Sequence, residues 1–397
     1  MTSKYIFFIL IGVDALILFL QTSQISISYE EASLVYGSFS PLQQLIKFSL
    51  TLFGNNDLGL RFVMIVFHIS SAILMYLISF RYIDEKRDRL WLLFIFLLLP
   101  GIVSSAIIVN SAGVIIFGLL LFVYLSEKIA QKYLNILLLL YSVTDIGFAY
   151  LFLGLSVYYF LTKRKILFIY MITLYMLTSF LYGFEVTGSP SGHFLDTIGV
   201  YSAIFSPIIF IYLFYSLYRK YLLSQVDMLW YLSSIILILS LILSFRQRIP
   251  LEHFGPYLII ALPIAAQSFI SSYRVRLKIF RTPYRVAFIV SLVFLLLNTF
   301  VVLFNKELYR VIENPRKHFA YEMHVAKELS EKLKKDKITC LVTDVKMQER
   351  LRFYGIKKCK SICLIQKKVN DINKNDVTIS YKNRVVYRAN VTKINNL

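Results

Sequence analysis

Eleven apolar runs, separated by short polar segments, recur between the N-terminus and residue 304. They lie at about 4–20, 58–80, 90–108, 110–126, 133–143, 145–162, 166–184, 197–218, 227–245, 254–273 and 286–304. A helix needs about 20 mostly apolar residues to cross a bilayer, and the run at 133–143 is the one that falls well short of this length. The pattern predicts an all-α polytopic membrane bundle of about 11 transmembrane helices.

The basic residues of the polar segments indicate how the chain is oriented. With the N-terminus in the cytoplasm, 17 Lys and Arg residues fall on the cytoplasmic side and 4 on the outer side, as the positive-inside rule requires. This alternation holds only if the short run at 133–143 also crosses. No small-residue cleavage site follows the first run, so we expect an uncleaved first helix and a C-terminal region outside the cytoplasm.

The first outer loop is the long one, with about 37 residues between the first two spans. Its segments "EEASLVYG" and "PLQQLIKFSLTLFG" both carry apolar residues at helical spacing. Pro41 suits the start of a helix, and Gly54 suits the end of one. We therefore expect two amphipathic helices on the membrane surface.

The residues after the last run form a different kind of segment. "RKHFAYEMHVAKELSEKLKKD" has a helical pattern, "KITCLVTD" and "SICLIQ" resemble strands, and "KMQERLRFYG" resembles a short helix. "DVTISYKNRVVYRANV" predicts a hairpin that turns at Lys382–Asn383. The chain is thus expected to consist of a transmembrane domain, 1–305, and a small α/β extracytoplasmic domain, 306–397.

Composition and charge agree with a membrane protein. Hydrophobic residues make up 57% of the chain and charged residues 17%, against about 45–50% and 25% in soluble domains. The net charge is +20, and residues 305–397 hold 22 Lys and Arg against 10 Asp and Glu. No nucleic-acid motif accompanies this basic region, so anionic lipid headgroups, a polyanionic glycolipid and a solvated surface remain as its expected surroundings.

Three cysteines, Cys340, Cys359 and Cys363, all lie in the C-terminal region. They contain no CxxC pair and make a poor zinc set. One disulfide with one thiol left over and three free thiols are both compatible with the spacing. The chain also lacks a P-loop and a GxSxG or HExxH motif, which argues against direct nucleotide use.

Two adjacent carboxylates, Glu30 and Glu31, stand where the chain leaves the first span. A carboxylate at the boundary of water and lipid can take a proton from a hydroxyl, hold a divalent cation or be solvated. Neighbouring residues on a helix point about 100° apart. At most one of the two acids can therefore face a given substrate atom.

The first loop resembles the opening of the membrane glycosyltransferases of the GT-C type, among them the protein O-mannosyltransferases and the lipid A aminoarabinose transferases. The matching residues, in order, are Glu30-Glu31, Pro41, Phe53-Gly54 and Leu60-Arg61. The later segment "RQRIPLEHFGPYLIIALPI" is similar to a late segment of these enzymes through Arg246, His253, Tyr257 and Pro263. The resemblance covers about residues 1–305. It departs from the family at Asn110, where an acidic residue is common.

The resemblance implies an inverting transfer of a sugar from a polyprenyl-phosphate donor. Glu30 or Glu31 would be the catalytic base, with Glu30 favoured because the first acid of the pair usually has this role. The residues expected to bind the substrate or its phosphate are Arg61, Arg246, Arg248, His253 and Tyr257. Asp57 occupies the position of a metal-binding acid in some relatives, although a helix N-cap explains it equally well. Whether a divalent metal is needed stays open.

The prediction is therefore a transferase of the bacterial inner membrane, which acts on a lipid, glycan or protein acceptor at the outer face. Three alternatives remain: a flippase or transporter of lipid-linked glycans, a glycan polymerase, and a non-catalytic relative. Transporters often have repeated halves, and none is visible here. A polymerase is expected to have a long central outer loop, whereas the long outer loop of this chain is the first one. The Asn110 departure favours a non-catalytic relative.

Overall fold

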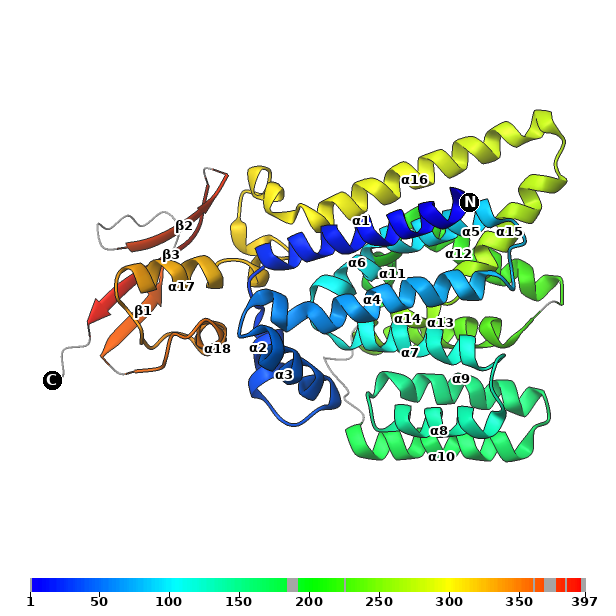
Figure 1. Cartoon of the computed structure of the whole chain (residues 1–397), viewed down its shortest axis with the longest axis horizontal. Helices are drawn as coiled ribbons and strands as arrows, with labels where there is room; N and C mark the ends of the chain where they lie inside the picture. Colours follow the sequence, from blue (N-terminus) through cyan, green and yellow to red (C-terminus); the bar gives the residue numbers. More distant parts are fainter. Residues whose placement is uncertain are drawn as a thin grey trace. The chain divides into compact units, whose positions relative to one another are not determined.

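In the computed structural model of the protein, every predicted apolar run is occupied by a helix (Figure 1). The structure describes residues 2–183, 192–224, 226–359, 361–367, 376–382 and 384–393. They form two compact units. The first comprises Met1–Leu16 and Met64–Thr299, and the second comprises Ile17–Val63 and Phe300–Leu397. The first loop thus belongs to one unit with the C-terminal region, whereas the expected division into domains at 305/306 stays a prediction.

The apolar runs of the bundle form the following helices. They are α1 (Thr2–Gln24), α4 (Asp57–Ser79), α5 (Lys86–Leu98), α6 (Pro100–Ile107), α7 (Ser111–Leu125), α8 (Gln131–Ser142), α9 (Gly147–Leu161), α10 (Lys165–Tyr182), α11 (Phe194–Phe205), α12 (Pro207–Leu222), α13 (Met228–Ser244), α14 (Leu251–Ile259), α15 (Leu262–Val275) and α16 (Thr282–Leu303), with a 3₁₀ turn at Lys278–Arg281. The predicted all-α multi-pass architecture is confirmed.

The number of crossings is less sharply defined than the helices themselves. Among the described residues, five helices are long and apolar enough to span a membrane, and two bent pairs raise the number to as many as seven. The pair α5–α6 bends by 57° and the pair α11–α12 by 103°, and α6 and α12 both begin with a proline, which cannot continue a helix from the preceding turn. The total of eleven spans stays a prediction.

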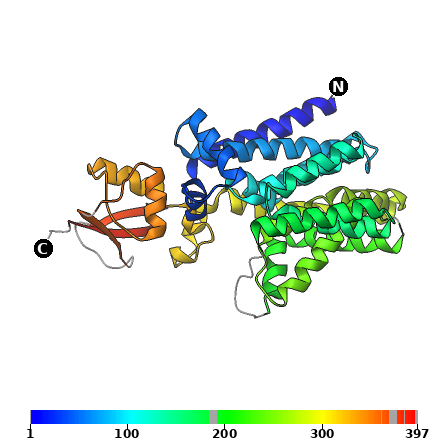
Figure 2. The ribbon, with the colours of Figure 1, turned by 90° about the horizontal axis from the view of Figure 1, so that it is seen from below.

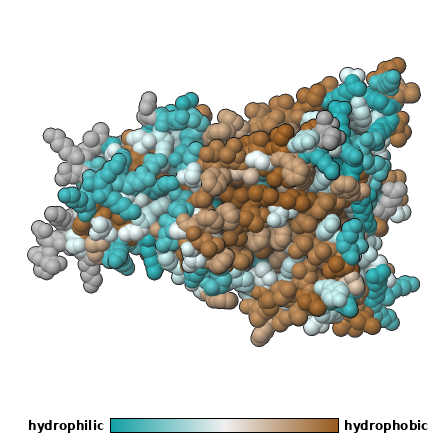
Figure 3. All heavy atoms as spheres, in the orientation of Figure 1, coloured by the Kyte–Doolittle hydropathy of each residue, from teal (hydrophilic) through white to brown (hydrophobic). Residues whose placement is uncertain are grey.

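The outer faces of the helices carry the side chains that hydrocarbon requires. In α16, Leu295 and Thr299 are the buried members of the described set, and large apolar residues such as Ile289 and Leu297 are exposed. Figure 3 shows hydrophobic residues gathered over the helices and hydrophilic residues over the C-terminal region. Exposed apolar surface on this scale is typical of contact with lipid or a partner.

The second unit contains the two predicted loop helices, α2 (Tyr29–Tyr36) and α3 (Pro41–Phe53). The ends of α3 lie where the sequence predicts them. The Ser40 hydroxyl accepts a hydrogen bond from the Gln43 amide, and Pro41 occupies the first helical position. Gly54 ends the helix with a φ of 81°, a conformation that glycine adopts without strain.

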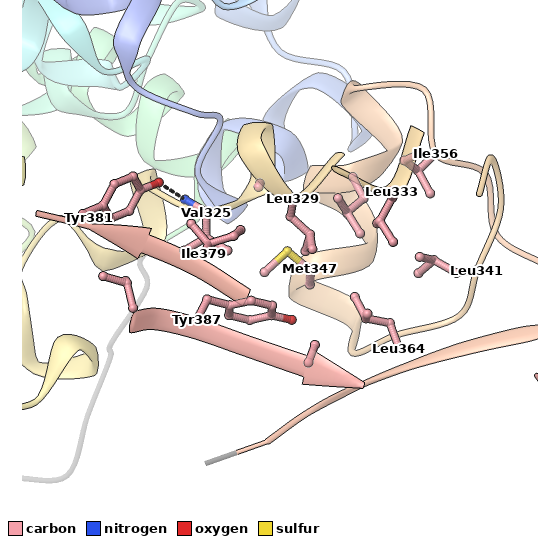
Figure 4. Close-up of a cluster of buried hydrophobic side chains, with 14 of the residues drawn as sticks. Val325, Leu329, Leu333, Leu341, Met347, Ile356, Leu364, Ile379, Tyr381 and Tyr387 are labelled. Atoms are coloured by element: carbon pink, nitrogen blue, oxygen red, sulfur yellow. Dashed lines mark hydrogen bonds between the residues drawn. The ribbon is translucent and has the colours of Figure 1, made fainter. Parts of the chain in front are cut away.

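The C-terminal part of this unit is a three-stranded antiparallel sheet with two helices packed against it (Figure 2). The strands are β1 (Ile362–Gln366), β2 (Asp376–Tyr381) and β3 (Arg384–Lys393) in the order β1-β3-β2, and the helices are α17 (Ala326–Lys335) and α18 (Val345–Phe353). The predicted hairpin is present as β2 and β3, although Asn383 of its turn lies outside the described residues. Apolar side chains from both helices and all three strands form one core (Figure 4).

Two predictions for this region are wrong in part. The helix expected from residue 316 begins at Ala326, because 3₁₀ turns at Asn305–Arg310, Pro315–Lys317 and Tyr321–Met323 precede it. The His318 side chain takes a backbone donor that a helix would use, since its Nδ1 accepts a hydrogen bond from the Ala320 amide at 3.0 Å. The segment "KITCLVTD" makes only isolated bridges through Cys340 and Val342 rather than a strand.

The cysteines adopt the first of the two expected arrangements. Cys340 and Cys359 form a disulfide, and Cys363 is free. The disulfide closes the loop that contains α18. It therefore restricts the helix and the turn that follows it in the unfolded chain as well as in the folded one.

A buried histidine makes the stability of the C-terminal region dependent on pH. The Tyr309 hydroxyl hydrogen-bonds His324 Nδ1 at 2.9 Å, and His324 Nε2 lies 2.9 Å from Asn305 Oδ1. Burial, with a further contribution from the Lys306 charge, lowers the pKa of His324 from 6.5 to about 3. His324 therefore stays neutral in the folded protein at pH values where the unfolded chain binds a proton.

We expect the free energy of unfolding of this region to fall as the pH drops from about 6.5 towards 3, by about 2 kcal/mol at pH 5. Thermal unfolding of the full chain at pH 7.5 and pH 5.0 measures the difference. His324→Gln removes the titrating group, so its unfolding temperature should change less between the two pH values. An equal change in the variant and the wild type would contradict the assignment.

Candidate active site

The two acids of the first loop are fixed by the way α2 begins. The Ser28 hydroxyl accepts a hydrogen bond from the Glu31 amide at 3.1 Å, and Glu31 Oε2 accepts one from the Ser28 amide at 2.9 Å. This reciprocal capping box satisfies two backbone donors that the helix start would otherwise leave open. Glu30 and Glu31 consequently both lie in the first turn of α2.

Glu31 forms a buried ion pair with Arg61. Arg61 Nη2 lies 2.7 Å from Glu31 Oε2, and Arg61 Nε lies 3.0 Å from Oε1, with both side chains fully buried. The remaining N–H groups of Arg61 donate to three backbone carbonyls, those of Thr22 (3.3 Å), Ile25 (2.7 Å) and Ser26 (3.0 Å). An arginine has five such donors, and all five are used within the chain.

Glu30 lies on the exposed side of the same turn. Its carboxylate makes no hydrogen bond or ion pair within the part of the chain that the structure describes. As their adjacent positions predict, the two acids face different surroundings. Glu31 is committed to Arg61 and the helix cap, and Glu30 is open to a substrate.

Asp57 is held by two residues of the C-terminal region. The Tyr354 hydroxyl donates to Asp57 Oδ1 at 2.5 Å, and Lys327 Nζ lies 2.8 Å from Oδ2. Burial and the Asp57 charge raise the pKa of Tyr354, so the phenol keeps the proton that it donates. Asp57 does not cap α4, because Asn56 Oδ1 accepts the Gly59 amide at 2.7 Å in that role.

The surroundings of Asp57 do not fit a divalent cation. A lysine and a phenol are not ligands for a hard cation, which prefers several carboxylate or carbonyl oxygens. Among the described residues there is no group of three or more His, Cys, Asp or Glu side chains that could hold a metal ion.

A second polar cluster belongs to the first unit and joins the ends of three helices. His253 Nδ1 of α14 lies 3.5 Å from Asp145 Oδ1, just before α9, and the Ser111 hydroxyl of α7 donates to Asp145 Oδ2 at 2.6 Å. The Tyr257 hydroxyl, fully buried, donates to the Gly147 carbonyl at 2.7 Å. His253 and Tyr257, which the sequence predicts as substrate ligands, are thus tied to the start of α9.

Arg246 and Arg248 differ from Arg61 in their exposure and in their hydrogen bonding. Both lie in the short segment between α13 and α14 and are exposed. In the described ranges, neither guanidinium group forms a hydrogen bond or an ion pair. Of the three arginines predicted to bind phosphate, these two have donors to spare, whereas Arg61 has none in this conformation.

Sequence reasoning missed Asp145, Ser111, Lys327 and Tyr354 as members of these clusters. Asp145 offered a weak signal, because it precedes Gly147 at the start of an apolar run. Lys327 and Tyr354 offered none. They meet Asp57 only because the C-terminal region folds against the first loop within the second unit.

The fold is similar to that of ArnT from Cupriavidus metallidurans. Its apo structure matches with a TM-score of 0.57 and 12% identity over 99% of this chain and 98% of ArnT. The structure bound to undecaprenyl phosphate matches with a TM-score of 0.54 and 10% identity over 96% and 97%.

No family model matches the chain, and no curated protein matches it. At these levels of identity, the likeness to ArnT establishes the fold. The resemblance seen in the sequence is therefore confirmed at the level of architecture.

Proposed function

We propose that the protein transfers a sugar from a polyprenyl-phosphate-linked donor to a lipid, glycan or protein acceptor at the outer face of a bacterial inner membrane. The observation that carries the proposal is the match to ArnT over nearly the whole of both chains. One of those ArnT structures is bound to undecaprenyl phosphate, which is a polyprenyl phosphate. The acidic first turn of α2 supplies the chemistry that such a transfer needs.

In this proposal Glu30 is the general base. It takes the proton from the acceptor hydroxyl as the oxygen attacks the anomeric carbon of the sugar. The bond between that carbon and the phosphate oxygen breaks on the opposite face, and the polyprenyl phosphate leaves with the electron pair. Glu31 does not compete for the role, because its carboxylate is occupied by Arg61 and the Ser28 amide.

Arg246 and Arg248 bind the donor phosphate. A guanidinium group can donate to two phosphate oxygens at once, and these two groups are exposed and have no partner among the described residues. Arg61 instead positions α2 through Glu31. Tyr257 positions α14 through its hydrogen bond to the Gly147 carbonyl. His253, paired with Asp145, lies close in sequence to the two arginines.

The orientation of the protein follows from the same proposal. The donor lipid enters from the outer leaflet, so the first loop and the C-terminal region lie outside the cytoplasm and the N-terminus lies inside. The Cys340–Cys359 disulfide supports this placement, since disulfides persist in oxidising compartments.

The test is transfer from a lipid-linked sugar with a radioactive label, using purified protein in nanodiscs and an extract of envelope acceptors. We expect a new labelled glycosidic product with the wild type. Movement of the labelled lipid between leaflets without a product would favour a transporter instead.

Arg246→Gln/Arg248→Gln should raise the KM for the donor about tenfold or more, because two phosphate contacts are lost. The double lysine variant, which keeps the charge, should recover part of the affinity. An unchanged KM in the glutamine variant would contradict the assignment of the two arginines.

A further inference from the structure

The chain that leads into α2 is bound to the C-terminal region by its backbone. The Ser26 amide donates to the Met323 carbonyl at 3.0 Å. The Ile27 amide donates to the Tyr354 hydroxyl at 2.9 Å, and Arg350 Nε donates to the Ile27 carbonyl at 3.0 Å. All of these residues belong to the second unit. The two residues that precede the capping residue of α2 therefore have their positions set by partners about 300 residues away in the sequence.

Two of these partners, Arg350 and Tyr354, come from one face of α18 and its continuation, whereas Met323 belongs to the preceding 3₁₀ turn. Lys346, Arg350 and Tyr354 are four residues apart, and residues at this spacing lie above one another on a helix. Arg350 is buried and also donates to the His324 carbonyl at 2.5 Å. Along this row, Lys346 is exposed, whereas Arg350 is buried and Tyr354 is partly buried where they bond the first loop.

The same helix contacts both ends of α2. Lys346 Nζ lies 5.4 Å from the ring centre of Tyr29, the first residue of α2. The Arg352 guanidinium lies 4.0 Å from the ring centre of Tyr36, the last residue of α2. Cations over aromatic faces at these distances attract the ring. α18 therefore follows α2 along its whole length.

Tyr354 links this row to the start of α4. Its hydroxyl accepts from the Ile27 amide and donates to Asp57, so it uses both of its hydrogen-bonding functions. Lys327 of α17 makes a parallel connection, since its Nζ lies 2.8 Å from both Asp57 Oδ2 and the Ser23 carbonyl. The two ends of the first loop are thus tied together through residues of the C-terminal region.

We propose that Lys346, Arg350, Arg352 and Tyr354 form a positioning clamp that holds α2, and with it Glu30, in the arrangement required for transfer. A helix of 8 residues is too short to be stable by itself, so its position depends on contacts of this kind. Displacement of a catalytic group by about 1 Å can cost about a hundredfold in rate. This inference rests on the proposed function for the role of Glu30, but the clamp itself does not.

The experiment compares Tyr354→Phe with Tyr387→Phe in the full chain in nanodiscs. Both variants remove one phenolic hydroxyl from the C-terminal region. The Tyr354 hydroxyl binds the first loop, whereas the Tyr387 hydroxyl has no hydrogen-bond partner in the described part of the chain. Tyr387→Phe therefore controls for a general loosening of the core.

Hydrogen exchange tests the clamp without reference to activity. In Tyr354→Phe, we expect the amides of residues 26–36 to exchange about tenfold faster or more, while those of α17 keep their wild-type rates. Tyr387→Phe should leave both segments unchanged. Equal exchange of residues 26–36 in Tyr354→Phe and the wild type would overturn the clamp, as would faster exchange throughout the C-terminal region.

Transfer kinetics then test what the clamp is for. If it positions Glu30, Tyr354→Phe lowers kcat about tenfold and leaves the KM for the donor unchanged, and Tyr387→Phe changes neither. Faster exchange of residues 26–36 with an unchanged kcat would overturn the positioning role. A wild-type protein without transfer activity but with the expected exchange pattern would overturn the proposed function and support the clamp.

Discussion

Arg61→Met is expected to destabilise the second unit by about 3–5 kcal/mol, the usual cost when one partner of a buried ion pair is removed. Methionine fills a similar volume but donates no hydrogen bond. Glu31 would keep its charge in a fully buried position, and the carbonyls of Thr22, Ile25 and Ser26 would lose their donors. The midpoint of thermal unfolding in detergent measures the loss.

Two further variants show that the effect comes from the ion pair. Lys47→Met replaces an exposed cation on α3 and should leave the midpoint within the scatter of the wild type. Adding Glu31→Gln to Arg61→Met removes the buried charge and keeps an oxygen for the Ser28 amide, so the double variant should be more stable than Arg61→Met alone. A wild-type midpoint for Arg61→Met would be incompatible with the pair as described.

Local patterns were sufficient to predict most of the helices. The apolar runs coincide with helices because burial in lipid or in the bundle acts on each run separately. The ends of α3 were also predictable from local sequence, since Pro41 and Gly54 act through their own backbone preferences. The number of crossings was harder to predict, because bends such as the one between α11 and α12 interrupt a run without changing its composition.

The C-terminal region shows where local patterns fail. The residues from 316 to 325 have a helical pattern, but His318 bonds the Asn305 carbonyl and His324 is buried against Tyr309. These contacts link residues that only the tertiary fold brings together, and they outweigh helix propensity. The segment 337–344 likewise forms no ladder, because it makes only isolated bridges through Cys340 and Val342.

For the candidate site, the sequence indicated the residues of the first loop but did not predict the contacts that each one makes. It indicated Glu30, Glu31, Asp57 and Arg61 through the order of short motifs in one loop. It could not predict that Arg61 pairs with Glu31, because partners 30 residues apart are joined by the fold and not by helical spacing. The same limit applies to Asp57, whose partners lie about 300 residues further along the chain.

Glu30→Gln is expected to lower kcat for sugar transfer by about 10²–10⁴, the usual contribution of a general base, without lowering the midpoint of thermal unfolding. The amide has almost the same shape as the carboxylate but cannot accept the acceptor's proton. Since Glu30 is exposed and has no side-chain partner among the described residues, its replacement disturbs no structural contact. Single-turnover transfer with saturating donor, together with thermal unfolding, measures both quantities.

Glu31→Gln is the matched variant, because it makes the same chemical change one residue further along α2. It should lower the unfolding midpoint, since Arg61 would lose its buried counter-ion, and any loss of transfer should follow the fraction of protein that stays folded. Glu30→Asp keeps a carboxylate on a side chain that is one methylene shorter, so it should retain more activity than Glu30→Gln. If instead Glu31→Gln is stable and inactive while Glu30→Gln transfers normally, the base is Glu31, and the Arg61 pair must open during the reaction. Normal transfer in both glutamine variants would remove the first turn of α2 from the chemistry altogether.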